Sequence, residues 1–280
     1  MKIFAPAKVN LALDVIGQRT DGYHELDMIM APISLYDEID IEKSETMKVI
    51  VEGMQLPEEN TITKMVRLCK ERFSLDSNYS IRVIKKIPSQ AGLAGGSADA
   101  AAVFRAILQL EDLKVSLDQQ LELAKEVGAD VPFCMVNQYA RVQGIGEKIT
   151  PIQSDWTFKI LLVKPSFGIS TPASFKLWHE QEPFHADVDY TQMAIENESL
   201  DLLVQAMNNA LEPVAFTLRK EMADIKEAML DAGMVRVMMS GSGSSLMGFC
   251  SEEEVFDQAV QKLKDQYEFV QVVTVGEAKC

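Results

Sequence analysis

One stretch, Pro88–Ala102, constrains the fold of this chain more than any other, because it joins a strand-like run to a helix-like run through three glycines. Residues 79–86 alternate as a strand does, and the alanine-rich residues 97–110 favour a helix. Gly92, Gly95 and Gly96 precede the expected helix start. A backbone without Cβ atoms can turn tightly there and approach a ligand closely. The stretch therefore predicts a strand, a glycine-rich loop and a helix in direct succession.

The start of that helix is a candidate anion site. A helix N-terminus offers unpaired N–H groups and the positive end of the helix dipole, a combination that binds phosphate. No lysine follows the glycines, so the loop is not a Walker A motif, and its spacing differs from G-x-G-x-x-G. The alternative is a glycine-rich turn that only caps a helix. The strand before the loop and the small residues Ser97 and Ala98 favour a phosphate site.

Length and charge limit the classes of function that the chain can have. Its 280 residues suit one large domain or two ordinary ones. No apolar run reaches the length of a membrane span, and residues 1–8 lack an apolar signal-peptide core, so we expect a cytoplasmic protein. The net charge of −15 opposes binding to nucleic acid or to anionic membranes. A phosphorylated ligand would therefore need local lysines or backbone N–H groups.

Cysteines and histidines show no metal-ligand spacing. We expect the cysteines to be reduced thiols. The residues concerned are Cys69, Cys134, Cys250, Cys280, His24, His179 and His185.

The pattern of apolar residues predicts alternating strands and helices with no repeats. A polar break at residues 153–155 suggests two domains, residues 1–155 and 156–280. Strands are expected at 8–16, 28–41, 48–52, 79–86, 134–142, 158–163, 234–239, 246–250 and 269–275. Helices are expected at 60–73, 97–110, 116–128, 252–267 and over 190–232, with breaks near 196–198 and at Pro213.

Two charged positions could carry chemistry. Lys8 and Asn10 lie two residues apart on the first strand, so their side chains share one face. An exposed strand face would explain them equally well. Asp130 lies among apolar neighbours just past a helix end, where it could be a helix N-cap or a turn residue. A Lys–Asp pair beside a phosphate loop could instead activate an alcohol for phosphoryl transfer, a reaction that depends on positioning and charge stabilisation.

Two loops are candidate ligand contacts. Tyr23 and His24, in an acidic loop, could stack on and hydrogen-bond a base, or could belong to an ordinary surface loop. Residues 240–245, Ser-Gly-Ser-Gly-Ser-Ser, could form a second anion-binding nest of N–H groups or a plain hairpin turn.

Taken together, these motifs resemble the GHMP superfamily of small-molecule kinases. The resemblance implies an α/β (α+β) two-domain kinase fold with the active site in the cleft between the domains. It is carried, in order along nearly the whole chain, by Ala5–Leu11, Arg19–Leu26, Ile87–Ala101, Gly128–Phe133, Gly144–Glu147 and Met239–Gly243.

The same resemblance implies an activity. The protein would transfer a phosphate from ATP, with Mg²⁺, to a hydroxyl of a small cytidine diphosphate-linked alcohol in non-mevalonate isoprenoid precursor synthesis. The alternatives are a different small alcohol as acceptor, or a weakly active nucleotide-binding relative. The protein would work as a monomer or a homodimer, without nucleic acid or membrane.

Residue roles also follow from the resemblance. Asp130 would be the general base and Lys8 its electrostatic partner, and no protein ligand for Mg²⁺ is implied. The residues that wrap the ATP phosphates would be Pro88, Ser89, Gln90, Ala91, Gly92, Leu93, Ala94, Gly95, Gly96, Ser97 and Ala98. The residues that bind the acceptor would be Asn10, Tyr23, His24, Phe175, Ser240 and Gly241, with Tyr23, His24 and Phe175 around the cytosine.

Three positions depart from the family pattern. Ala98 stands where a second serine is usual, and Asn137-Gln138 lies where a Gly-Gly pair is usual. Ser244-Ser245 replaces Pro-Thr after the last Gly-Ser-Gly. These changes leave Lys8 and Asp130 in place and bear on rate and acceptor identity.

Overall fold

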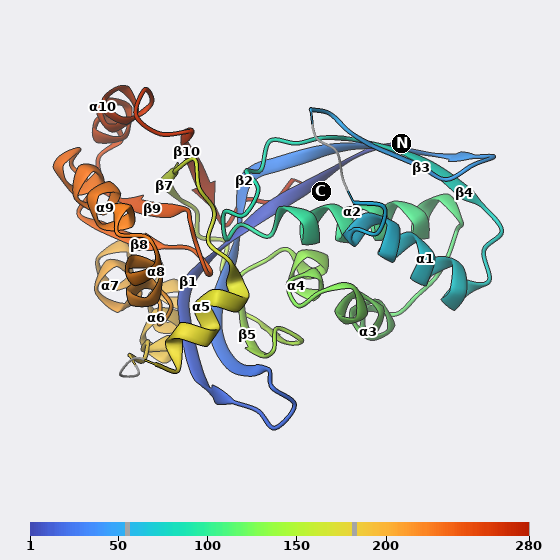
Figure 1. Cartoon of the computed structure of the whole chain (residues 1–280), viewed down its shortest axis with the longest axis horizontal. Helices are drawn as coiled ribbons and strands as arrows, with labels where there is room; N and C mark the ends of the chain where they lie inside the picture. Colours follow the sequence, from blue (N-terminus) through green and yellow to red (C-terminus); the bar gives the residue numbers. More distant parts are fainter. Residues whose placement is uncertain (54–56, 181–183, 280) are drawn as a thin grey trace.

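A long pair of antiparallel strands joins the two lobes of the protein (Figure 1). The computed structural model describes residues 1–53, 57–180 and 184–279. Strand β1 (Lys2–Gln18) pairs with β2 (His24–Ser44) from Lys2–Asp40 to Gln18–His24. Register shifts interrupt the pairing on either side of the segment from Lys8 to Asn10, and such bulges redirect side chains. The predicted first strand is therefore confirmed and is longer than expected.

The described strands form one ten-stranded sheet. Its main path runs β3-β4-β2-β10-β7-β9-β8, with β1 and β5 also paired to β2, and β6 paired to β5. Because β2 contacts strands of both lobes, the sheet is continuous, and the domain boundary after residue 155 stays a prediction. The remaining strands are β3 (Lys48–Val51), β4 (Asn78–Ile84), β5 (Ala140–Gly144), β6 (Lys148–Pro151), β7 (Phe158–Lys164), β8 (Arg236–Met239), β9 (Leu246–Phe249) and β10 (Phe269–Val275).

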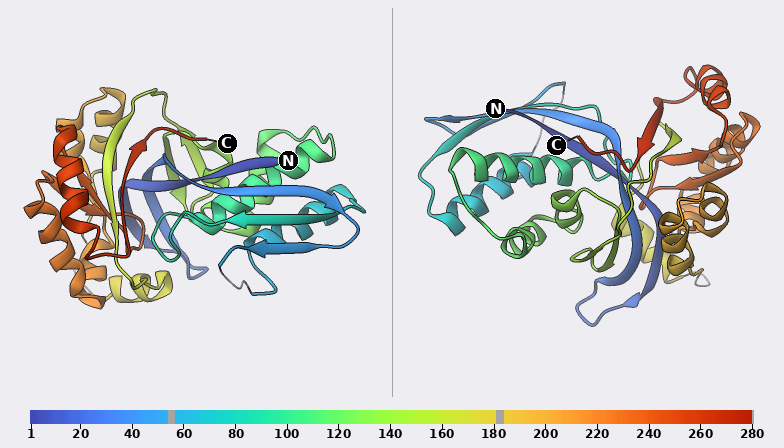
Figure 2. Two further views of the ribbon diagram at one scale, coloured as in Figure 1. Left: turned by 90° about the horizontal axis from the view of Figure 1, so that it is seen from above. Right: turned by 180° about the vertical axis from the view of Figure 1, so that it is seen from behind.

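Helices α1–α4 belong to one lobe and α5–α10 to the other (Figures 1 and 2). No helix among the described residues is long and apolar enough to cross a membrane. The bounds are α1 (Thr61–Phe73), α2 (Gly95–Leu110), α3 (Leu117–Val127), α4 (Val131–Val136), α5 (Thr171–Trp178), α6 (Val188–Glu196), α7 (Leu200–Ala206), α8 (Glu212–Leu218), α9 (Glu221–Asp231) and α10 (Glu253–Leu263).

Local chemistry explains where several helices begin. The Asn60 side chain accepts hydrogen bonds from the N–H groups of Ile62 and Thr63 at the start of α1. Ser116 and Gln119 form the predicted capping box of α3. Helix α2 begins at Gly95 rather than at Ser97, so two of the three loop glycines lie inside its first turn.

Two predictions of secondary structure were wrong. Residues 134–136 belong to helix α4, and the strand predicted from Cys134 begins only at Ala140. A short apolar run suits a buried helix as well as a buried strand, and Pro132 in the first turn favours the helix. Pro213 likewise lies in the first turn of α8, so the break comes before it, after Ala206.

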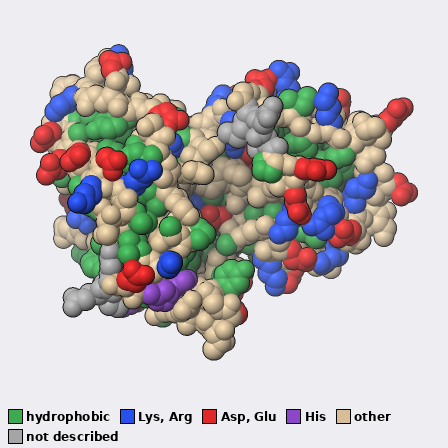
Figure 3. Space-filling view, viewed as in Figure 1, with side chains coloured by type: hydrophobic (Ala, Val, Ile, Leu, Met, Phe, Trp, Pro, Cys, Tyr) green, Lys and Arg blue, Asp and Glu red, His purple; other side chains and the backbone are tan. Residues whose placement is uncertain are grey.

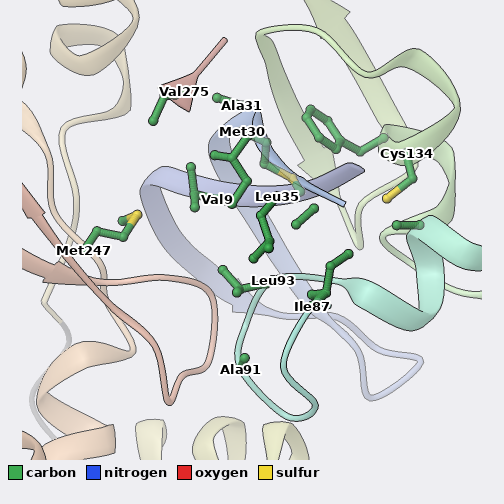
Figure 4. Close-up of a cluster of buried hydrophobic side chains, with 14 of the residues drawn as sticks. Val9, Met30, Ala31, Leu35, Ile87, Ala91, Leu93, Cys134, Met247 and Val275 are labelled. Carbon is green, nitrogen blue, oxygen red and sulfur yellow. The ribbon is translucent and has the colours of Figure 1, made fainter. Parts of the chain in front are cut away.

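Apolar side chains pack between the sheet and the helices. In Figure 4, Leu93 of the glycine loop and Ile87, which precedes the loop, belong to the same buried cluster as Val9 and Leu35 of the long strand pair. The loop is therefore anchored to β1 and β2 by buried apolar contacts. Three cysteines, Cys69, Cys134 and Cys250, are buried free thiols, as predicted, whereas Cys280 lies outside the described residues.

A buried ion cluster ties α2 to the sheet below the glycine loop. The Lys85 ammonium contacts the carboxylate of Asp37 and donates to Asp99 Oδ2 over 2.7 Å. Asp37 is fully buried, and its Oδ1 accepts the backbone N–H groups of Lys86 and Ile87 at 2.5 and 2.9 Å. Strand β2, the end of β4 and the first turns of α2 are thereby held together.

Asp99 should make stability depend on pH. Burial, opposed by Lys85 and assisted by Asp37, raises the pKa of the Asp99 carboxyl to about 7, against about 3.9 in an unfolded chain. The stabilisation from protonated Asp99 is complete below about pH 4 and is lost as the pH rises through about 7. Relative to Asp99→Asn, the free energy of unfolding of the wild type should fall by roughly 2 kcal/mol between about pH 5.5 and about pH 8.

Urea unfolding of both proteins across that range measures the difference. A gap that stays constant with pH would show that Lys85 keeps Asp99 ionised throughout.

Candidate active site

A cleft of about 1260 Å³ lies between the two lobes. Figure 3 shows the surface hollowed between them. Its walls come from the glycine loop, strand β1, the β1–β2 turn, the residues before α4, helix α5 and the loop between β8 and β9. Segments from both halves of the sequence therefore meet in one place.

The glycine loop forms one wall with an uncapped helix N-terminus. The residue before α2, Ala94, has a φ of 58° and makes no side-chain capping bond. The first N–H groups of α2 are thus left for a ligand. Gly92 has a φ of +74°, and a Cβ there would come within 2.1 Å of the Ser240 carbonyl oxygen. Only glycine allows this approach between the two loops.

The second loop, residues 240–245, is both a hairpin turn and a wall of the cleft. It connects the antiparallel strands β8 and β9, and Gly241, Ser242 and Gly243 line the cleft, so its role as an anion-binding nest stays a prediction. Its N–H groups at Ser244 and Ser245 donate to the carbonyls of Gln90 and Ala91, at 3.3 and 3.2 Å. Two backbone hydrogen bonds therefore join the second loop to the glycine loop.

The side chain of Asn209 fixes the conformation of the loop at residues 240–245. This buried side chain donates from Nδ2 to the carbonyls of Met239 and Gly241, both at 2.8 Å, and its Oδ1 accepts from the N–H of Leu211. An amide that satisfies three backbone groups in a buried position fixes the loop conformation.

Lys8, Asn10 and Asp130 form a polar group at the floor of the cleft. The Lys8 ammonium donates to Asn10 Oδ1 at 2.7 Å and to the Gly92 carbonyl at 3.1 Å, and it lies 3.8 Å from Asp130 Oδ2. Lys8 and Asn10 are buried, so the alternative of an exposed strand face was wrong. Asp130 occupies the N-cap position of α4 without making a capping bond. Its side chain, 37% exposed, lines the cleft, whereas the neighbouring Lys8 is buried.

An aromatic cluster lies at the other end of the cleft. The His24 ring stacks on Phe175, with ring centres 4.5 Å apart and planes 21° from parallel. The Nε2 atoms of His24 and His179 are 2.7 Å apart, and Trp178 packs edge-on against His24. Burial, together with His179, lowers the pKa of His24. Tyr23 is exposed and lines the same end of the cleft. The residues that the sequence analysis placed around a base therefore lie together.

The cleft lining contains several cations although the chain carries a net charge of −15. Its charged lining among the described residues consists of Lys8, Lys85 and Lys176 with one carboxylate, Asp130. Together with the free N–H groups of α2, these lysines can attract an anion to a protein whose overall field repels it.

Most of the predicted site residues line this cleft. Pro88–Ser97, Lys8, Asn10, Tyr23, His24, Asp130, Phe175 and Gly241 all contribute to its surface. Ala98 and Ser240 do not. Ala98 faces the core. The buried Ser240 hydroxyl donates to the Gly92 carbonyl at 3.1 Å and accepts from the Asn10 N–H at 3.3 Å.

Sequence reasoning missed three residues around the cleft: Lys85, His179 and Asn209. His179 had a signal, because it follows Phe175 by four positions and so shares its helical face. Lys85 looked like the end of a strand, and Asn209 lay within the helix predicted over residues 190–232, whereas the structure places it between α7 and α8.

The three departures from the family pattern leave the cleft lining unchanged. Ala98 points into the core. Asn137 ends α4 with a φ of 50°, a conformation that asparagine tolerates almost as glycine does. Ser244 supplies an N–H to the Gln90 carbonyl that proline lacks, and its hydroxyl donates to the Phe167 carbonyl at 2.6 Å.

Comparison with known proteins agrees with this geometry. The family model of the GHMP kinases N terminal domain matches residues 60–138, and that of the GHMP kinases C terminal domain matches residues 193–268. A relative named 4-diphosphocytidyl-2-C-methyl-D-erythritol kinase from Acetivibrio thermocellus is 41% identical over 93% of this chain and 94% of its own length. One with the same name from Thermoanaerobacter pseudethanolicus is 38% identical over 96% of this chain and 94% of its own.

A solved structure has the same architecture. The crystal structure of a 4-(cytidine 5'-diphospho)-2C-methyl-D-erythritol kinase superposes with a TM-score of 0.84 and 31% identity, over 99% of this chain and 100% of its own. The two-domain α/β kinase fold expected from the sequence is therefore confirmed. With both domain models matched and full-length relatives above 30% identity, this chain belongs to the GHMP kinases.

Proposed function

We propose that this protein is an ATP-dependent kinase that phosphorylates the 2-hydroxyl of 4-diphosphocytidyl-2-C-methyl-D-erythritol, a step of non-mevalonate isoprenoid precursor synthesis. The observation that carries the proposal is the cleft itself. It brings an uncapped, glycine-rich helix N-terminus, a Lys–Asp pair and an aromatic cluster onto one surface. These parts suit the phosphates of ATP, a hydroxyl to be activated and a base, respectively.

The glycine loop, Pro88–Ala98, is proposed to hold the phosphates of ATP. Backbone N–H groups at the start of α2 would donate to phosphate oxygens. Ala98 would contribute by packing α2 onto the core rather than by direct contact.

Asp130 is proposed as the general base. The acceptor hydroxyl would attack the γ-phosphorus while its proton passes to an Asp130 carboxylate oxygen, and ADP would leave with the electrons of the broken P–O bond. Lys8, 3.8 Å from Asp130, would stabilise the negative charge near the transferred group. Asn10 and the Gly92 carbonyl hold the Lys8 ammonium in place.

The aromatic end of the cleft is proposed to hold the cytosine. Tyr23, His24 and Phe175 would contact the base, and Asn10 and Gly241 would lie toward the acceptor, with the buried Ser240 behind them. Ser240 would act through the Gly92 carbonyl and the Asn10 N–H, which it bonds. In the free protein His24 occupies one face of Phe175, so a base would use the other face or displace the imidazole.

Mg²⁺ is proposed to enter with ATP. The described residues contain no group of three His, Cys, Asp or Glu side chains suited to a metal ion. Mg²⁺ commonly binds through substrate phosphates, waters and few protein ligands, which fits this cleft. When bound, it would neutralise charge on the phosphates.

No observation favours a different alcohol. All three departures from the family pattern leave the cleft lining intact. The cytoplasmic location and the choice between monomer and homodimer stay predictions.

Asp130→Asn should abolish most of the activity. Because an amide cannot accept the hydroxyl proton, ADP release with Mg-ATP and 4-diphosphocytidyl-2-C-methyl-D-erythritol should fall by about 10²- to 10⁴-fold, with ATP affinity unchanged. Asp118→Asn, the same change on the exposed start of α3, is the control. Near-normal turnover by Asp130→Asn would exclude this aspartate as the base. No ADP release by the wild type would overturn the proposed acceptor.

Phe175→Leu should weaken acceptor binding alone. Loss of one stacking face is worth about 1–3 kcal/mol, so the KM for the cytidine substrate should rise by about 5- to 150-fold while the KM for ATP stays constant. Phe184→Leu, at an exposed phenylalanine outside the cleft, is the matched control. Equal changes in both KM values would contradict a role specific to the base.

A further inference from the structure

His179 lies at the aromatic end of the cleft and has no role in the family resemblance or in the proposed reaction. It is the C-cap residue of α5, is exposed and lines the cleft. Its Nε2 atom lies 2.7 Å from Nε2 of His24, the first residue of β2. The two histidines are 155 positions apart in the sequence. Their contact therefore joins a strand from the first half of the chain to a helix from the second.

Neighbouring aromatic rings hold the His24 imidazole in this orientation. Phe175 stacks on it with ring centres 4.5 Å apart, and Trp178 packs edge-on at 6.1 Å. The buried Trp178 also packs edge-on against the His179 ring, at 5.2 Å. All three neighbours of His24 belong to α5 or to its C-cap. One helix end therefore directs Nε2 of His24 at His179 before any ligand arrives.

The short distance between the two Nε2 atoms restricts where their protons lie. Burial, together with His179, lowers the pKa of His24, so this ring is neutral at neutral pH. A neutral imidazole carries one hydrogen, on either nitrogen, and accepts with the other nitrogen. Two facing nitrogens form a hydrogen bond only when one of them carries a hydrogen and the other does not. The state of His179 Nε2 therefore decides the state of His24 Nε2.

The second ring nitrogen of His24 is available to a ligand. Within residues 1–53, 57–180 and 184–279, the one hydrogen bond found for the His24 ring is that of Nε2. The residue lines the cleft. When Nε2 donates to His179, Nδ1 of His24 is an acceptor, and when Nε2 accepts, Nδ1 is a donor. The position of the proton on His179 is thus transmitted to the nitrogen that a ligand meets.

Cytosine and uracil differ in the hydrogen-bonding edge that such a nitrogen would contact. The amine at position 4 of cytosine donates, whereas a carbonyl in the same place on the ring accepts. Cytosine N3 accepts, whereas N3 of uracil carries a hydrogen. A nitrogen with a fixed donor or acceptor character therefore pairs with one base and leaves an unpaired group against the other, which is how a polar site rejects an analogue.

We propose that His179 is a positioning residue that fixes the tautomer of His24 and thereby sets the preference of the cleft for cytosine over uracil. The inference rests on the proposed cytidine substrate and deepens it. His179 acts through His24 rather than by contact with the base.

His179→Glu and His179→Lys test the inference in opposite directions. A carboxylate only accepts and an ammonium only donates, so Glu makes His24 Nε2 a donor and Lys makes it an acceptor. Nitrogen NMR of the imidazole rings reports the tautomer, at about pH 8, above the ordinary histidine pKa of about 6.5. The signals can be assigned by substitution because the chain has 3 histidines. The wild type should match one variant and differ from the other.

Calorimetry with CDP and with UDP, without ATP, then gives the ratio of the two affinities for each protein. The two nucleotides carry the same charge, so the ratio cancels the charge introduced at position 179. The variant with the wild-type tautomer should keep the wild-type ratio, and the other should lose about 5- to 150-fold of it. Glu180→Lys, a charge change at the next exposed residue, is the control and should keep the ratio.

Three results would overturn the inference alone. They are a His24 tautomer that does not follow the residue at position 179, equal ratios in the two variants, and a wild type that binds CDP and UDP equally. A merely structural role for His179 would weaken both nucleotides together and so give equal ratios. A wild type that binds neither nucleotide overturns the proposed cytidine substrate as well.

Discussion

The arrangement of the segments that line the cleft depends on the Gly92 carbonyl oxygen. It accepts hydrogen bonds from the Lys8 ammonium and the Ser240 hydroxyl, both at 3.1 Å. Strand β1, the glycine loop and the β8–β9 loop thus meet at one oxygen atom. The approach is possible only because Gly92 has no Cβ, which would lie 2.1 Å from the Ser240 carbonyl oxygen. The backbone at Gly92 therefore fixes the distance between the two loops and the position of the Lys8 ammonium relative to Asp130.

The sheet explains why distant segments can meet there. Strand β2 pairs with β1 along most of its length, with β5 near one end, with β4 near the other and with β10 at Ile33 between them. A strand shared in this way makes the two lobes parts of one hydrogen-bonded framework. The shifts in register around Lys8 and Asn10 turn both polar side chains into a buried position. The burial of a lysine is tolerated because Asn10, Gly92 and Asp130 surround its ammonium.

Sequence was sufficient where the determining chemistry is local, and insufficient where it is not. The capping box at Ser116 and the glycine loop are short patterns, and both were found. Residues 131–136 are apolar throughout, so periodicity could not separate helix from strand, and packing against α2 and α3 decides for the helix. The burial of Lys8 could not be predicted either, because its partners Gly92 and Asp130 come from remote parts of the chain. For the same reason the sequence predicted Lys85 only as part of a strand, because its partners Asp37 and Asp99 come from other elements.

Net charge is a poor guide to the ligand of this protein. A net charge of −15 disfavours the approach of a polyanion at long range. Within a Debye length of about 10 Å, however, the local arrangement dominates. There Lys8 lies beside Asp130 and Lys85 is paired with Asp37 and Asp99, so the positive end of the α2 dipole and Lys176 favour an anion. Some acidic residues lie in surface ion pairs, such as Glu38 with Lys2 and Lys86, where neighbouring cations cancel much of their field. Binding of a nucleotide by an acidic kinase is then a matter of a few oriented donors, so removing one lysine from the lining should matter more than removing several from the surface.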